Sequence, residues 1–271
     1  MTREIADDAA APAAIRSIYE DIRAVLGSPV VNLVYRRLAG QGEDVLRDSW
    51  RLLRPAYLDG RIARYAAPLA LIVPKDMAMP GALPPATAGD MPAIRAVIAA
   101  YNANNARNLV AFSALLGLEP GGTDFPPLDG GAGMPDAPSG IPIDRPIPAL
   151  PAFDSLPEAL QQTIRRLNLF GGTGEEGAPI ASLYVHLSHW PEMLAYVERL
   201  LQPLHDAGTL TRWRVETSDR AAMAPLSDLR APAELRTILE PILGALVRRT
   251  IPKMVPIGTY LGRALKPGAS G

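Results

Sequence analysis

The sequence of 271 residues contains no cysteine. Without thiols the chain forms no disulfide, has no thiolate nucleophile and offers zinc no cysteine ligand. The absence agrees with a reducing compartment, so we expect a cytoplasmic protein. The first residues, Met1–Asp8, lack the apolar core that follows the basic start of a signal peptide, and we expect no such peptide.

Aromatic residues are also scarce, at 6% of the chain, and much of the 48% hydrophobic content is Ala and Leu. These two residues favour helices because they lose little side-chain entropy there. Long apolar runs are missing: Ala66–Val73 contains a proline and is much shorter than the about 20 residues of a membrane span. Composition therefore predicts an all-α protein that does not span a membrane.

Neither sign of charge is in excess, with 27 basic and 28 acidic residues and a net charge of −1. A nucleic-acid-binding surface needs clustered basic residues, so we expect no nucleic-acid partner. The length allows one large domain or two fused smaller ones. At this size a chain buries roughly 70–75% of its unfolded surface and needs no disulfide or metal to form a core.

Apolar residues recur at the helical spacings of three and four. The first stripe contains Ile15, Ile18 and Ile22, and Gly27 after it is typical of a helix end. The pattern predicts helices at 13–26, from Ser28-Pro29 to about Gly40, at 43–58, 61–79 with proline breaks, 92–116, 157–170, 178–191, 192–206, 209–222 and 232–249. Pro252 and Pro256 are then expected to break or kink the chain before a last helical turn near Tyr260.

Proline and glycine are concentrated in residues 119–155. Proline interrupts both helix interiors and central strands, so this stretch is predicted to be a surface linker. It would separate a first helical repeat, residues 1–118, from a second one, residues 156–271. We expect the two repeats to pack together as one compact domain.

The two predicted repeats can be aligned with one insertion. Pro29 and Tyr35 in the first correspond to Pro179 and Tyr184 in the second. Units of this length are much longer than those of solenoid proteins, so the alignment indicates a duplicated, pseudo-symmetric molecule. A small-molecule pocket is expected at the seam between the repeats.

Three motifs are similar to known sites of chemistry, but each has a simpler interpretation. His186, His189 and Glu192 are three residues apart, whereas zinc-binding helices place histidines four apart, so we expect two partly exposed, hydrogen-bonded histidines and no metal. Ser182 lacks the G-x-S-x-G elbow of a nucleophile and is interpreted as a first-turn or capping residue. Gly171–Gly174 lacks the lysine of a phosphate-binding loop and is interpreted as a turn, so no cofactor is expected.

A polar island interrupts the predicted helix at 92–116. It contains Tyr101, Asn102, Asn104, Asn105 and Asn108. Asparagine is a mediocre helix former, so four of them within seven positions require a reason. They could join helices by hydrogen bonds or cover an exposed face, or they could hold a small polar ligand or a water molecule.

Two motifs carry a resemblance to a known family. The pattern P-x-A-S-x-[YF]-x-x-L-x-x-W-P spans Pro179 to Trp190-Pro191, and [YF]-N-x-x-N begins at Tyr101. Together with I-Y-E-D-I-R at Ile18–Arg23 they resemble the group I 2-haloacid dehalogenases, also called halocarboxylic acid dehalogenases, which act on both D- and L-2-haloacids. The resemblance implies an all-helical fold of two pseudo-repeats. It also implies a site in which an Asp activates the water that displaces the halide and an Asn holds that water.

The resemblance assigns roles to individual positions. Asn105 matches the water-holding Asn, but Leu183 stands where the family has its Asp, so the catalytic base is unknown. Val30 occupies a position where the family has an aromatic residue, and Ala245 a position where it has a Tyr. The residues expected to contact substrate are Asn102, Asn105, Ala181, Ser182, Leu183, Tyr184, Val30 and Ala245. In the first repeat Val34 matches Leu183, so both halves present an apolar side chain there.

The sequence leaves three functions open. The chain could be a diverged enzyme that no longer uses an Asp-activated water and works through Asn102, Asn105, Ser182, Tyr184 and His186. It could be a catalytically silent binding or interaction protein, or an active 2-haloacid hydrolase with a relocated base. If it is an enzyme, we expect a hydrolase that acts on a small molecule such as a small carboxylic acid. Its apolar helical surface is compatible with a homodimer.

Overall fold

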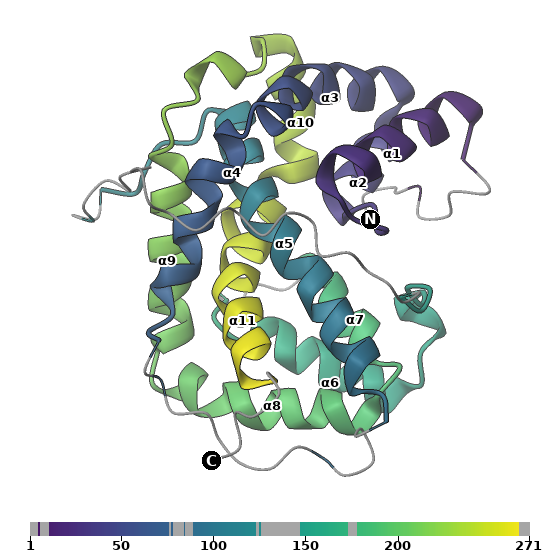
Figure 1. The fold of residues 1–271 in the computed structure, drawn as a ribbon, viewed down its shortest axis with the longest axis vertical. Coiled ribbons are helices and arrows are strands. Elements are labelled where there is room, and N and C mark those ends of the chain that lie inside the picture. Colours follow the sequence, from purple (N-terminus) through teal and green to yellow (C-terminus); the bar gives the residue numbers. More distant parts are fainter. Residues whose placement is uncertain are drawn as a thin grey trace.

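The computed structural model describes residues 5, 11–75, 77, 84, 89–122, 125, 147–172 and 178–265. All regular structure in these residues is helical, as the composition predicts. Two helices, α5 (Met91–Leu116) and α11 (Ile251–Ala264), run side by side through the middle of the molecule (Figure 1). The other helices gather in two groups, one towards each end of this central pair.

The described helices are divided between the two halves of the chain. The first half contains α1 (Ala13–Leu26), α2 (Leu33–Gln41), α3 (Glu43–Leu58), α4 (Arg61–Ala66), the 3₁₀ helix η1 (Ala67–Ile72) and α5. The second contains α6 (Glu158–Leu169), α7 (Ser182–Leu187), α8 (Pro191–Asp206), α9 (Thr209–Ala222), α10 (Ala233–Ala245), the π turn η5 (Leu246–Thr250) and α11, with 3₁₀ turns at Phe153–Ser155 and Ser227–Leu229. The duplication itself stays a prediction. Most of the predicted linker, residues 123–124 and 126–146, lies outside the described residues.

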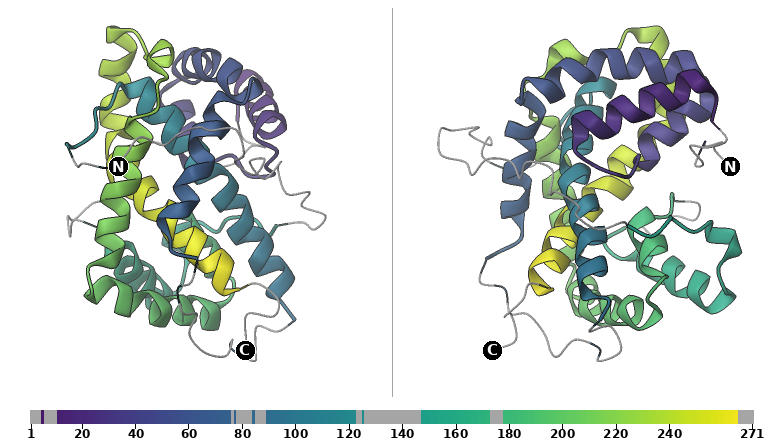
Figure 2. Two further views of the ribbon diagram at one scale, coloured as in Figure 1. Left: turned by 60° about the vertical axis from the view of Figure 1, so that its left-hand side comes forward. Right: turned by 45° about the vertical axis from the view of Figure 1, so that its right-hand side comes forward.

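The hydrophobic core consists of two clusters. One joins α1–α3, the C-terminal part of α5 and α10, and the other joins α6–α9, the N-terminal part of α5 and α11 (Figure 2). Helix α5 contributes Leu109–Leu116 to the first cluster and Met91–Tyr101 to the second. The polar island of α5 therefore lies where this helix passes from one core to the other.

Of the break or kink expected at Pro252 and Pro256, with a last helical turn near Tyr260, the described residues show no break. Helix α10 continues through the π turn η5 directly into α11, and Pro256 lies inside α11. A proline ring clashes with the carbonyl four residues earlier, and the wider π turn lies immediately before Pro252, where that clash would occur. Nearly all of Ile251–Leu261 is buried, so packing in the core offsets the cost of the two prolines.

The second predicted helix starts later than expected. Helix α2 begins at Leu33 rather than at Ser28-Pro29. The Ser28 hydroxyl accepts a hydrogen bond from the Val30 N–H (3.2 Å) and donates one to the Val30 carbonyl (3.1 Å), which holds a turn in place of a helix. This turn brings Asn32 to the N-cap position of α2.

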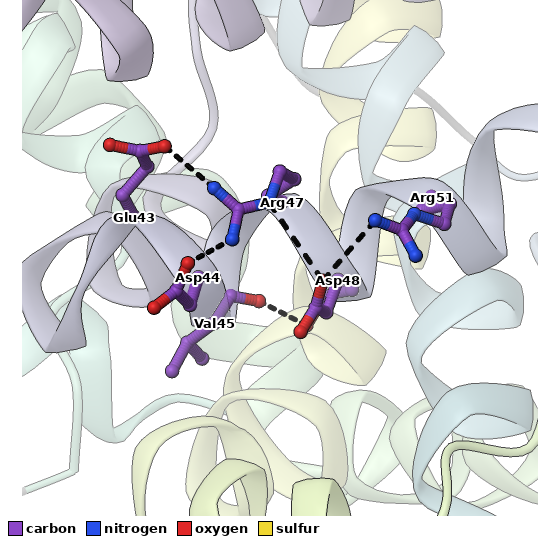
Figure 3. A network of polar contacts seen from close by, with 7 residues as sticks. Glu43, Asp44, Val45, Arg47, Asp48 and Arg51 are labelled. Carbon is purple, nitrogen blue, oxygen red and sulfur yellow. Dashed lines mark hydrogen bonds and ion pairs between the residues drawn. The ribbon is translucent and has the colours of Figure 1, made fainter.

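Ion pairs cover the solvent face of α3 (Figure 3). Arg47 pairs with Glu43 at 2.6 Å and with Asp44, and Arg51 lies 3.9 Å from Asp48. Glu43 and Asp44 lie in the first turn of α3, where negative charges interact favourably with the positive end of the helix dipole. All these side chains are largely exposed, so each pair contributes little to stability. No helix in the described residues is long and apolar enough to cross a bilayer.

Candidate functional site

A small pocket lies where α2, α5, α7 and the π turn meet, between the two hydrophobic cores. Its volume is about 40 Å³, which exceeds the ~10–15 Å³ that one water molecule requires. The start of α2, the loop into α7, the middle of α5 and the η5–α11 junction each contribute to its wall. The lining residues are Asn32, Leu33, Val34, Tyr101, Asn105, Asn108, Ile180, Ala181, Ser182, Leu183, Leu246, Thr250, Ile251 and Met254.

One face of α5 supplies the polar part of this pocket. Tyr101, Asn105 and Asn108 are spaced by four and three residues, so their side chains lie on one side of the helix. Asn102 lies about 100° further round the helix and lines a different cavity, between α5 and α11. There its amide donates to the Gly258 carbonyl at 2.6 Å. The asparagines of the polar island thus line two different cavities.

Asn108 joins helices by hydrogen bonds. Its Oδ1 accepts from the hydroxyls of Tyr35 (3.1 Å) and Tyr57 (2.8 Å). Burial raises the pKa of both tyrosines well above 10, so both hydroxyls stay protonated and can donate. Asn104 is likewise engaged, through a bond to the Ala100 carbonyl at 3.1 Å.

Asn105 differs from these neighbours. Its side chain is half-buried, lines the pocket and makes no hydrogen bond to the described part of the chain. A buried amide without a partner is costly, whereas one that faces a pocket can bind a ligand or water. Asn105 is therefore the α5 amide best placed to contact a bound molecule.

The segment before α7 is fixed by the neighbouring helices. Asn168 on α6 accepts from the Ala181 N–H (3.2 Å) and donates to the Pro179 carbonyl (3.3 Å). Thr250 in the π turn also donates to the Pro179 carbonyl, at 3.3 Å. These bonds hold Leu183 in the pocket wall, where only 1% of its surface is exposed.

One positively charged side chain, Arg36, lies beside the pocket. Arg36 on α2 is buried, with 7% exposure, and its Nη2 lies 3.5 Å from the Ser182 hydroxyl. None of the described residues that line the pocket is Asp, Glu or His. The surroundings therefore combine apolar walls, amide and hydroxyl groups and one adjacent positive charge.

Tyr101 and His186 form a hydrogen-bonded pair behind the pocket. His186 Nε2 lies 2.7 Å from the Pro148 carbonyl, which can only accept, so this nitrogen carries the proton. Nδ1 is then the acceptor for the Tyr101 hydroxyl at 3.2 Å. Burial is the main cause that lowers the pKa of His186, with smaller contributions from His189 and Arg36, so the ring is neutral at neutral pH.

The expectation of two partly exposed histidines is wrong for His186, which has 1% exposure. His186 is buried because its short helix, α7, packs with its core side against α5. His189 is exposed and lies 2.9 Å from the Ala149 carbonyl. In the described residues no group of three His, Cys, Asp or Glu side chains could hold a metal ion.

The structure brings four of the predicted contact residues to the pocket: Asn105, Ala181, Ser182 and Leu183. The others lie elsewhere: Asn102 in the second cavity, Tyr184 fully buried in the second core, Val30 in the turn before α2 and Ala245 exposed beside Leu246.

Sequence reasoning did not assign Asn32 and Thr250 to the pocket. Asn32 could have been found as the polar residue preceding Val34, the repeat partner of Leu183. Thr250 gave no such signal, because it reaches the pocket through the π turn.

The helical architecture defines an all-α protein with a small pocket between its two cores. No protein-family profile and no curated protein sequence matches this chain. Solved structures do match, and all three compared here are D-2-haloacid dehalogenases. A complex with L-LA has a TM-score of 0.73 and 19% sequence identity, covering 98% of this chain and 97% of the other.

Two mutant structures agree with this match. One D-2-haloacid dehalogenase mutant has a TM-score of 0.72 and 17% identity, with 98% and 96% of the two chains covered. A mutant in complex with D-2-CPA has a TM-score of 0.66 and 18% identity, with 98% and 93% covered. The chain therefore has the fold of the D-2-haloacid dehalogenases over its whole length.

Proposed function

We propose that the pocket binds a small carboxylic acid in a diverged enzyme that no longer hydrolyses 2-haloacids through an Asp-activated water. The supporting observation is Leu183. The resemblance assigns it the position of the family's Asp, and it is a buried apolar side chain in a pocket wall without any carboxylate. Loss of a general base removes a factor of ~10²–10⁴ in rate.

The remaining groups suit a carboxylate ligand. Asn105 and Ser182 can donate hydrogen bonds into the pocket, and Arg36 adds a buried positive charge next to Ser182. Asn32–Val34 present the start of α2, and the positive end of a helix dipole favours an anion. If none of these groups converts the ligand, the chain is a binding protein on the same fold.

Binding of 2-chloropropionate and propionate tests the pocket directly. We expect the wild type to bind both, and Asn105→Ala to bind about tenfold more weakly, because one hydrogen bond to a charged ligand is lost. Isothermal titration calorimetry measures the two affinities. Asn102→Ala is the matched control: it removes the same amide three residues earlier on α5, on the face towards the other cavity, and should leave the affinity unchanged. Equal weakening by both variants, or no wild-type binding at millimolar ligand, contradicts the proposal.

A second candidate is an active hydrolase with a relocated base, which the Tyr101–His186 pair favours. Tyr101 lines the pocket, and its hydroxyl can pass a proton to the neutral His186. A water in the pocket would give its proton to the Tyr101 oxygen while the Tyr101 proton moves to His186 Nδ1. The resulting hydroxide attacks C2, and the halide leaves with the bonding electron pair.

Halide release at several pH values tests this candidate. If the wild type turns over 2-haloacids, His186→Gln and Tyr101→Phe are expected to lower kcat at least about 100-fold. The activity should fall as pH drops below the histidine's lowered pKa, because only the neutral ring accepts the proton. His189→Gln, on the exposed neighbour, is the control and should keep full activity. Unchanged turnover in His186→Gln excludes the relay.

A further inference from the structure

A second and much larger cavity lies on the opposite face of α5. Its volume is about 500 Å³, within the ~300–1,000 Å³ typical of small-molecule sites. It is bounded by α4 and η1 on one side, α5 on another and α11 on the third. These four elements lie close together in the ribbon views (Figure 2). No residue lines both this cavity and the small pocket.

Small apolar side chains form most of its wall. Helix α4 and η1 contribute only alanines, α5 contributes three more at Ala99, Ala103 and Ala106, and α11 contributes Gly262. Small residues on facing helices usually allow close packing, but here they leave space. The wall therefore offers a smooth hydrocarbon surface, with few side chains able to fill the space between the helices.

All charged residues of the wall are arginines. Arg95, Arg107 and Arg263 line the cavity, and none of its described lining residues is acidic. In the described residues Arg95 donates to the Leu265 carbonyl at 2.5 Å, and Arg263 donates to the carbonyls of Ala70 and Val73 at 3.0 and 2.7 Å. Carbonyl acceptors satisfy N–H groups without neutralising a guanidinium charge, and Arg95 and Arg263 have no acidic partner among the described residues, which favours an anion.

The arginines are distributed unevenly along the cavity. The bonds of Arg95 and Arg263 place both at the end formed by Ala70 and Leu265. Arg107 lies twelve positions beyond Arg95 on α5, about 18 Å along the helix axis. The cavity is thus elongated, with two positive groups at one end and alanine walls along its length. Burial lowers the pKa of Arg107.

We propose that this cavity binds a medium-chain fatty acid, with its carboxylate on Arg95 and Arg263 and its alkyl chain along the alanines of η1, α4 and α5. The carboxylate would accept charge-assisted hydrogen bonds, the strongest kind that arginine makes. The hydrocarbon chain would remove apolar surface of both partners from water. This site is separate from the pocket at Leu183, and its occupancy does not depend on any reaction there.

Decanoate and decanol are the probes, with calorimetric titration into the full-length wild-type protein. They share a ten-carbon chain and differ in charge, so the comparison needs no variant. We expect decanoate to bind at least about tenfold more tightly than decanol, since each charge-assisted hydrogen bond to arginine is lost with the neutral head group. Equal affinity of the two, or binding of neither, overturns the proposal.

Variants then locate the ligand. Arg95→Gln should weaken decanoate binding about tenfold and leave decanol unchanged, whereas Arg95→Lys should restore most of the affinity because it keeps the charge. Ala103→Leu should weaken both ligands by filling the cavity. Ser182→Ala, in the small pocket, is the control and should leave decanoate binding unchanged. Circular dichroism verifies folding of each variant. Loss of decanoate binding in Ser182→Ala but not in Arg95→Gln would place the fatty acid in the small pocket and contradict the proposal.

Discussion

Leu183→Asp is expected to create 2-haloacid hydrolysis that the wild type lacks. The substitution places a carboxylate between Ser182 and the rest of α7, in the wall that Asn105 faces across the pocket. In that position it can accept a proton from a water molecule held by the Asn105 amide. A positioned general base contributes ~10²–10⁴ in rate, so halide release from 2-chloropropionate should rise by about that factor.

The new carboxyl group carries a cost in stability. Leu183 has 1% exposure, so the variant exchanges a buried apolar side chain for a polar one, and we expect the free energy of unfolding to fall by about 3 kcal/mol. Desolvation disfavours the ionised form and raises the pKa of a buried carboxyl group. Activity should therefore increase with pH through neutrality, which a pH profile of kcat/KM would show.

Leu183→Asn is the matched control for this experiment. Its side chain has nearly the same size and polarity as Asp but cannot accept a proton as a base. Halide release in the Asp variant should exceed that of the Asn variant at least about 100-fold, and the wild type should match the Asn variant. Turnover by the wild type would contradict the loss of the base. If both variants are folded and equally inactive, Leu183 does not occupy the position that the resemblance assigns to it.

Much of the helical architecture could be predicted from the spacing of apolar residues. The helix expected at 209–222 has those same limits, and α5 begins within one residue of its predicted start and ends at the predicted residue. In α9 the buried residues Leu210, Trp213 and Thr217 recur at spacings of three and four, so local pattern and tertiary burial agree. The late start of α2 was missed because a serine side-chain turn competes with the helix, which apolar spacing does not reveal.

The C-terminal helices show why local rules fail in a core. Two prolines predicted a break, yet α11 passes through Pro256 because its surroundings bury it on nearly every side. A proline costs about 3 kcal/mol in a helix interior, and the burial of several large apolar side chains exceeds this. The π turn that accommodates Pro252 also brings Thr250 to the pocket. Neither feature follows from residue spacing, because both depend on how two cores are joined.

The candidate site was predictable only in part, for a geometric reason. The motif around Ser182 and the polar island on α5 do converge on one pocket. Which asparagine faces that pocket depends on the rotation of α5 between α2 and α11. Asn102 and Asn105 are neighbours on the helix surface, but each is turned towards a different cavity. The two residues are three positions apart, which is about 60° round the helix, so a small rotation of α5 decides between them.

The stability of the protein is expected to rise with pH because of Lys253. This side chain has 3% exposure and donates to the carbonyl of Asn168 and, at 3.5 Å, to its Oδ1. Burial, and to a lesser extent the charge of Arg214, lowers the pKa of Lys253 from 10.5 to about 8. Between these two values the unfolded chain keeps a proton that the folded chain releases. Stability therefore increases as pH rises from about 8 towards 10.5.

The free energy of unfolding is expected to rise by about 2 kcal/mol between pH 7 and pH 9.5. The whole pKa shift of Lys253 corresponds to about 3 kcal/mol, at ~1.36 kcal/mol per pKa unit. Urea denaturation at several pH values measures it. Measurements should stop near pH 9.5, because burial raises the pKa of Tyr57, Tyr101 and Tyr184, and their stabilising contribution is lost above pH 10.

Lys253→Met should abolish the rise, because the variant has no buried ammonium group to deprotonate. Lys75→Met, at an exposed lysine, is the control and should keep it. The same pH slope in the wild type and in Lys253→Met would show that Lys253 does not carry the effect. The Lys253 ammonium group donates to Asn168, and Asn168 in turn holds Pro179 and Ala181 at the pocket. Lys253→Met should therefore also weaken carboxylate binding at the pocket, although the side chain does not line it.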